Sequence, residues 1–144
     1  MKKLLVLFSA SLLIGNIASA QTFAKTTEPT VLFEDQKVEV KYHYQNCEKP
    51  WNGTKDEMVY LDITNKTDKE LTLTWINERY YGPQCYGCDK NPEMLQTITL
   101  APKETQSGGC SRIEKRALEV TAQKLDFPFE HALSKLRFAL QKTE

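Results

Sequence analysis

The chain has 144 residues, and its 19 basic and 19 acidic side chains give a formal net charge of zero. This length suits one domain with a sizeable core, and a near-neutral chain without a basic stripe argues against nucleic acid as a partner. Beyond the first twenty residues no apolar run reaches membrane length, so no membrane span is expected there.

Residues 1–20 have the organisation of a secretory signal peptide. Lys2 and Lys3 form a positive start, residues 4–14 are apolar, and Ala-Ser-Ala at 18–20 is a cleavage site. An uncleaved anchor is the alternative, but the apolar run is short for a membrane span. We therefore expect a secreted or periplasmic protein. The polar, Thr-rich residues 21–30 are expected to form a flexible lead-in.

From residue 31 onward, apolar and polar side chains alternate in short segments, which predicts β-strands. Polar stretches rich in turn-forming residues separate them, notably at 46–56 and 65–69. The predicted strands are 31–33, 37–45, 57–64, 71–76, 94–100, 105–111 and 117–123. The side chains expected to face the core are Val38, Val40, Tyr42, Tyr44, Val59, Leu61, Ile63, Leu71, Leu73, Trp75, Ile98, Leu100, Leu118, Val120 and Ala122.

The segment 129–141 fits two patterns. Phe129 and the leucines at 133, 136 and 140 would share one face of a helix, whereas Leu136, Phe138 and Leu140 would share one face of a strand. We favour a strand, preceded by one helical turn at 130–132. The resulting seven to eight short strands, with no amphipathic helix between them, predict an all-β fold. Specifically, we expect an antiparallel, immunoglobulin-like β-sandwich over residues 31–144.

Four cysteines in an exported domain predict two disulfides. If chain direction reverses at each connection, Cys47, Cys85, Cys88 and Cys110 all lie at one end of the sandwich. One turn separates Cys85 from Cys88, so their pairing is the easiest and leaves Cys47 for Cys110, although the other two pairings stay open.

Metal binding and thiol chemistry are the alternatives for these cysteines. A zinc site would favour two Cys-x-x-Cys pairs, and the chain has one. A redox site would favour a helix after the motif, but Cys88 is followed by Asp-Lys-Asn-Pro. No metal or cofactor is therefore expected.

Aromatic residues are the candidates for a binding surface. Trp51, Tyr80, Tyr81 and Tyr86 are expected at the same end as the cysteines, where aromatic loops suit carbohydrate stacking or a protein partner. The alternative is that they pack around the disulfides as a small cap.

Catalysis is not expected. His43 lies on the polar face of its strand, where we expect a solvated side chain, and His131 lies in the ambiguous tail. Neither histidine has a suggested nucleophile partner, and no hydrolase motif is present.

Several short motifs follow one another along the chain: Asn46-Cys47, Val59-Tyr60-Leu61, Asn65-Lys66-Thr67, Trp75 with Glu78-Arg79-Tyr80-Tyr81, Cys85-x-x-Cys88, Leu100-x-Pro102 and Gly109-Cys110. This set resembles a group of small exported four-cysteine proteins of Gram-negative bacteria that have no assigned function. The resemblance covers residues 37–141 and implies a β-sandwich with a strand in the tail. It implies no activity, substrate or catalytic residue.

Taken together, the sequence predicts a non-enzymatic binding module for a glycan or a cell-envelope protein. A structural, envelope-associated accessory domain without a ligand is the first alternative. A metal-binding or thiol-redox protein acting through Cys85-x-x-Cys88 is the second.

Overall fold

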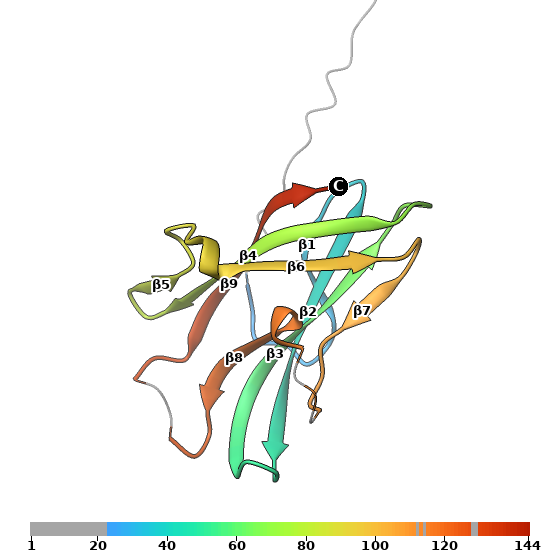
Figure 1. Cartoon of the computed structure of the whole chain (residues 1–144). Helices are drawn as coiled ribbons and strands as arrows, with labels where there is room; N and C mark the ends of the chain where they lie inside the picture. The colour runs from blue at the N-terminus through green and yellow to red at the C-terminus, as the bar shows by residue number, and fades with distance from the viewer. Residues whose placement is uncertain (1–22, 112, 114, 128–129) are drawn as a thin grey trace, which may run out of the picture.

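The computed structural model describes residues 23–111, 113, 115–127 and 130–144. The expected signal peptide and Phe129 lie outside these residues. Within the described ranges the chain is all-β, with one five-stranded and one four-stranded antiparallel sheet (Figure 1). Its regular elements besides the strands are two 3-10 turns, at Pro92–Met94 and Arg116–Leu118. The described part of the chain has no helix with the length and apolarity needed to cross a membrane.

The first sheet is built around β3 (Thr54–Asn65). β1 (Thr30–Glu34) pairs with β2 (Val38–Lys49), and β2 pairs with β3 along its whole length. The other edge of β3 pairs with two short strands in succession. β8 (Glu119–Lys124) pairs with residues 56–60 of β3, and β7 (Thr105–Ser107) pairs with residues 62–64.

The second sheet is built around β4 (Leu71–Tyr81). β9 (Leu133–Thr143) pairs with residues 73–81 of β4. β6 (Leu95–Leu100) pairs with residues 71–76, and β5 (Gln84–Tyr86) with residues 79–81. Because β9 spans both of these stretches, β5 and β6 share the opposite edge of β4.

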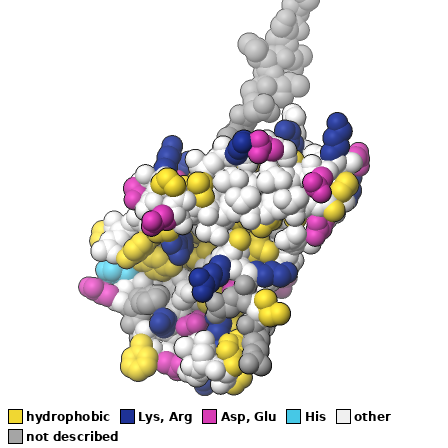
Figure 2. Space-filling model, viewed as in Figure 1, with side chains coloured by type: hydrophobic (Ala, Val, Ile, Leu, Met, Phe, Trp, Pro, Cys, Tyr) yellow, Lys and Arg dark blue, Asp and Glu magenta, His cyan; other side chains and the backbone are white. Residues whose placement is uncertain are grey.

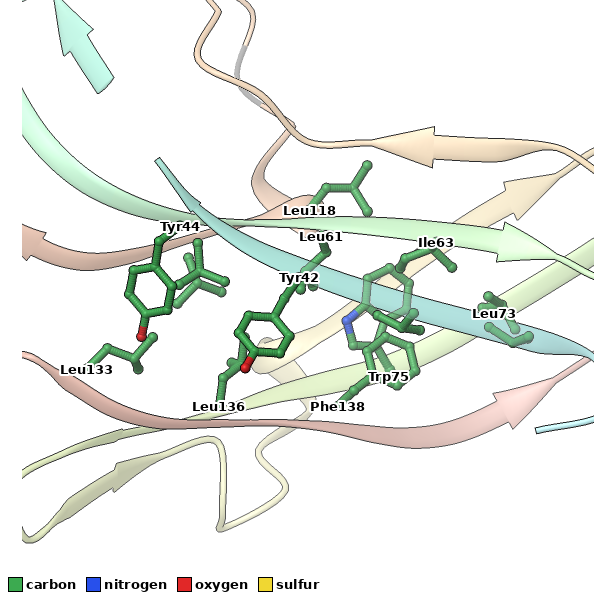
Figure 3. Close-up of a cluster of buried hydrophobic side chains, with 14 of the residues drawn as sticks. Tyr42, Tyr44, Leu61, Ile63, Leu73, Trp75, Leu118, Leu133, Leu136 and Phe138 are labelled. Carbon is green, nitrogen blue, oxygen red and sulfur yellow. The ribbon is translucent and has the colours of Figure 1, made fainter. Parts of the chain in front are cut away.

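The core lies between the sheets, where the apolar faces of the strands meet (Figure 3). Trp75 is fully buried and stacks on Phe138 from β9, with ring centroids 5.2 Å apart. Every side chain that strand alternation predicted to face inward is buried, except Ile98, which packs against the core while partly exposed. The all-β prediction is therefore confirmed down to its core residues.

The tail is a strand, as we favoured, but its expected helical turn at 130–132 is absent, because these residues form a bend before β9. β9 pairs with β4 along residues 73–81, with two register shifts, and its Leu136 and Phe138 are buried in the core. The tail forms a strand because alternate side chains, those of Leu136, Phe138 and Leu140, pack between the two sheets.

Several predicted boundaries are wrong because cross-strand pairing continues through polar residues. β2 and β3 extend into the expected loop at 46–56 and leave only a turn at 50–53, with Cys47 opposite Asp56. β4 continues to Tyr81 and folds back as β5, which the sequence did not predict. The predicted strand at 105–111 ends at Ser107.

Residues 23–29, which the sequence suggested as part of a flexible lead-in, lie against β2. The ring of Phe23 stacks on Tyr42 at 4.8 Å, and the Tyr42 hydroxyl donates to the carbonyl of Ala24 at 2.8 Å. The backbone N–H of Tyr44 donates to the carbonyl of Thr26 at 2.7 Å. These contacts attach the segment to the first sheet.

Candidate functional site

The four cysteines form two disulfides, Cys47–Cys110 and Cys85–Cys88, with Cα–Cα distances of 5.4 and 5.8 Å. The pairing that the sequence favoured is therefore confirmed. With every sulfur in a disulfide, no thiolate is available for zinc in this state. Among the described residues, no group of three His, Cys, Asp or Glu side chains is placed to hold a metal ion.

The prediction that all four cysteines share one end of the sandwich is wrong, because the two disulfides belong to different sheets. In Figure 1 β2, which carries Cys47, ends at the bottom, whereas β5, which carries Cys85, lies at the left. Because Tyr42 and Tyr44 face the core, strand alternation places Cys47 on the outward face of the first sheet. There it is fully buried in a small separate cluster with Met58 and Tyr60. The segment that carries Cys110 leaves β7 and is bridged to this outward face, whereas the second disulfide belongs to the other sheet.

The Cys85–Cys88 disulfide closes the turn that follows β5 and holds it against the outward side of β4. Gly87 has a φ of +90°, and a Cβ there would lie 2.7 Å from Cγ2 of Ile76. The Tyr80 hydroxyl lies 3.3 Å from the sulfur of Cys88. This disulfide therefore anchors the edge of the sheet on which β5 lies.

The four predicted aromatic residues do not form one surface. Trp51, 42% exposed, lies in the β2–β3 turn at the bottom of Figure 1, away from β5 on the left. Tyr80 faces outward from β4, with the ammonium of Lys135 5.2 Å from its ring centroid. Only Tyr81 and Tyr86 come together, with their rings edge to face at 5.7 Å.

Tyr81 and Tyr86 line a cavity of about 700 Å³ at the edge between the two sheets. Cross-strand partners share a face, so the inward direction of Tyr81 and Arg79 on β4 is shared by Gln84 and Tyr86 on β5. The opposite side comes from β8 and from the bend before β9. The full lining is Arg79, Tyr81, Pro83, Gln84, Tyr86, Thr121, Glu130 and His131.

Hydrogen bonds and close packing hold the walls of this cavity in place. The Tyr81 hydroxyl donates to the carbonyl of Thr121 at 2.5 Å and so ties β4 to β8 across the two sheets. Burial raises the pKa of the Tyr81 hydroxyl, so it stays protonated and can donate. The Tyr86 hydroxyl donates to Oε1 of Gln84 at 2.9 Å. Gly82, with a φ of +56°, lets the ring of His131 approach, because a Cβ there would lie 2.5 Å from it.

Arg79 is the lining residue with the least satisfied polar groups. Its Nε is buried and has no hydrogen-bond partner among the residues that the structure describes. The hydrogen bond of its guanidinium within the described residues runs from Nη2 to the thioether of Met94 at 3.8 Å, and a thioether is a weak acceptor. The adjacent Glu78 cannot compensate, because successive strand residues face opposite ways, and Glu78 lies 3.4 Å from Arg137 instead.

A second cavity, of about 610 Å³, lies beside β2 and includes Lys25, His43 and Glu57. Its lysine and glutamate form an ion pair with each other. The expectation of a solvated His43 is wrong, because the side chain is 20% exposed and its buried Nδ1 has no hydrogen-bond partner in the described part of the chain. His43 lies 3.8 Å from Asp62 Oδ2, with its ring near Tyr60. Since the ion pair already neutralises the charges, this cavity is the weaker candidate.

The sequence prediction named two of the cavity's aromatic residues but missed Arg79, Gln84 and Thr121. One signal was present: the alternation that places Leu71, Leu73 and Trp75 inward also places residues 77, 79 and 81 inward. Polar side chains at such positions indicate that the strand is leaving the core and entering a site. No such signal pointed to Thr121, which reaches the cavity only through the stacking of the sheets.

Comparison with known proteins found no relative of this chain. No protein-family model, curated protein or solved structure matches the chain.

Proposed function

We propose that the protein is an exported, non-enzymatic binding module whose ligand is a glycan held in the cavity beside Tyr81 and Tyr86. The observation that carries this proposal is the paired aromatic wall: Tyr86 is 45% exposed, and the cavity of about 700 Å³ lies beside it. Aromatic rings stack on the apolar faces of sugars, and nearby polar groups can bind sugar hydroxyls. A concave site of this volume suits a small ligand better than a flat protein surface.

The composition of the lining supports binding rather than catalysis. Hydrolysis of a glycosidic bond usually needs two carboxyl groups on either side of the bond. The described lining holds one, that of Glu130, whose side chain is 92% exposed and lies 4.0 Å from Nε2 of His131. A binding module needs no such pair.

Two disulfides support the proposed export, because disulfides persist in oxidising compartments. The signal peptide, the secreted or periplasmic location and the immunoglobulin-like arrangement of the sandwich stay predictions. Basic and acidic side chains are mixed on the face seen in Figure 2, which is consistent with a ligand other than nucleic acid.

A matched pair of variants tests the proposed site. Tyr86 and Trp51 are exposed to nearly the same extent, 45% and 42%, but lie at different places on the domain. Binding of the oxidised full chain to a panel of neutral and acidic oligosaccharides is measured by calorimetry. Tyr86→Ala should weaken binding about tenfold, the equivalent of about 1.4 kcal/mol, while Trp51→Ala leaves it unchanged.

The proposed function fails if no oligosaccharide binds the wild-type protein. It also fails if Trp51→Ala abolishes binding while Tyr86→Ala does not. The melting temperature of each variant serves as the control for folding, and we expect neither exposed ring to change it by much.

The accessory-domain alternative is favoured by a different observation. Phe127, 82% exposed, and Leu125 lie in the β8–β9 loop, and the N–H of Leu125 donates to the carbonyl of Lys55 at 2.8 Å. Lys55 follows the turn that carries Trp51, so three exposed apolar side chains lie at the same tip of the first sheet. Exposed apolar groups of this kind suit a protein contact, and Trp51→Ala would then disrupt complex formation instead.

A further inference from the structure

We propose that the ligand carries a carboxylate and that Arg79 binds it, which identifies the ligand class as an acidic sugar such as a uronic acid. This inference rests on the proposed function, because it concerns the same cavity. It adds a charge requirement that aromatic stacking alone does not impose.

Arg79 lies on β4 between two inward-facing residues whose polar groups have hydrogen-bond partners. The preceding inward residue, Asn77, is satisfied: it accepts from Nε1 of Trp75 at 3.0 Å and donates to the carbonyl of Ala117 at 3.4 Å. The following inward residue, Tyr81, donates to Thr121. Arg79 lies between them, and within the part of the chain that the structure describes it has only the thioether contact and a buried Nε without a partner. Of the described residues that line the cavity, Arg79 is thus the one with a buried polar atom that has no hydrogen-bond partner.

Within the described residues no carboxylate forms an ion pair with Arg79. Glu78 is on the other face of β4 with Arg137, and Glu130, on the rim, faces solvent beside His131. A partly buried cation without a counter-ion is costly, so the guanidinium favours an anion that enters the cavity.

The geometry of the group favours a carboxylate among anions. A guanidinium presents a planar set of N–H donors that matches the two oxygens of a carboxylate. The cavity offers a single arginine and no second lysine or arginine in its described lining. Sulfate and phosphate esters are usually held by several donors or cations, so they fit this lining less well. The tyrosine rings beside Arg79 would at the same time pack against the sugar ring.

The test compares matched ligands on matched variants. The ligands are trisaccharides of galacturonic, glucuronic and mannuronic acid, the methyl esters of each, and a sulfated trisaccharide. The proteins are the oxidised full chain, Arg79→Gln, Arg79→Lys and the control Lys142→Gln, which removes a charge at the far end of β9. Calorimetry gives each dissociation constant at fixed ionic strength.

We expect at least one uronic acid to bind wild type and Lys142→Gln equally, and to bind Arg79→Gln about ten- to a hundredfold more weakly. Arg79→Lys should restore only part of the affinity, because an ammonium cannot pair bidentately. The methyl ester should bind weakly and should not respond to Arg79→Gln. That difference in response would show that Arg79 contacts the carboxylate.

The inference is overturned, while the binding module stands, if acid and ester bind equally or if the sulfated sugar binds as well as the uronic acids. It is also overturned if Arg79→Gln weakens both forms alike. If no trisaccharide binds at all, the inference is overturned, and the proposed function falls with it only if the neutral oligosaccharides of the first panel also fail to bind. Should Arg79→Gln fail to fold, the comparison of acid with ester on wild type still decides the question.

Discussion

Replacing both cysteines of a disulfide by alanine tests how each of the two bridges stabilises the fold. Cys47 and Cys110 are 63 positions apart, whereas Cys85 and Cys88 are 3 apart. If a disulfide acts by restricting the unfolded chain, the longer loop contributes about 4 kcal/mol and the shorter about 2 kcal/mol. The bridge between distant segments should therefore be the more important for stability.

The surroundings of the sulfurs enlarge this difference. Cys47 is fully buried against Met58 and Tyr60, so alanine there leaves a cavity that costs about 1 kcal/mol. Cys88 is exposed, and its loss leaves no cavity. The expected decreases in the free energy of unfolding are thus about 5 kcal/mol for the first pair and about 2 kcal/mol for the second.

Urea unfolding of the oxidised double variants measures both decreases. Tryptophan fluorescence follows the transition, because Trp75 is fully buried in the core, and the wild-type protein is measured beside the variants without reductant. Changing both cysteines of a pair avoids a free thiol that could exchange. The reasoning is refuted if Cys85→Ala with Cys88→Ala destabilises as much as the other pair, or if Cys47→Ala with Cys110→Ala costs less than about 2 kcal/mol.

Three further predictions concern single residues. Asn65→Ala should cost about 2–3 kcal/mol in the same urea assay, because this buried side chain accepts from Thr67 and donates to three backbone carbonyls. Asn52→Ala, at an exposed turn, should cost about 1 kcal/mol or less. Gly87→Ala should lower the melting temperature more than Gly53→Ala: both have a positive φ, but a Cβ meets a side chain only at Gly87. Burial, and then nearby carboxylates, raise the pKa of Tyr60 to about 12 from 10.0. The folded protein thus holds this proton more tightly than the unfolded chain, so stability should fall as pH rises from 10 to 12, and less so in Tyr60→Phe. Equal pH profiles for the two proteins would count against that assignment.

The alternation of apolar and polar residues was enough to predict the all-β class, the core side chains and the strand in the tail. Alternation is a local property, because successive strand residues point to opposite faces whatever the strand pairs with. The short spacing of Cys85 and Cys88 was likewise enough to favour their disulfide, which in turn favoured Cys47 with Cys110.

Only the tertiary structure decided where polar segments become strands and which side chains converge. β2 reaches Lys49 because β3 pairs with it there, and local polarity carries no information on such pairing. Cys47 lies outside the main core because it points to the face of β2 opposite to Tyr42 and Tyr44. The turn that carries Trp51 belongs to the first sheet, whereas Tyr86 and the Cys85–Cys88 disulfide belong to the second. The cavity itself joins residues from β4, β5, β8 and the bend before β9. Its existence depends on how the two sheets stack, and long-range packing determines that.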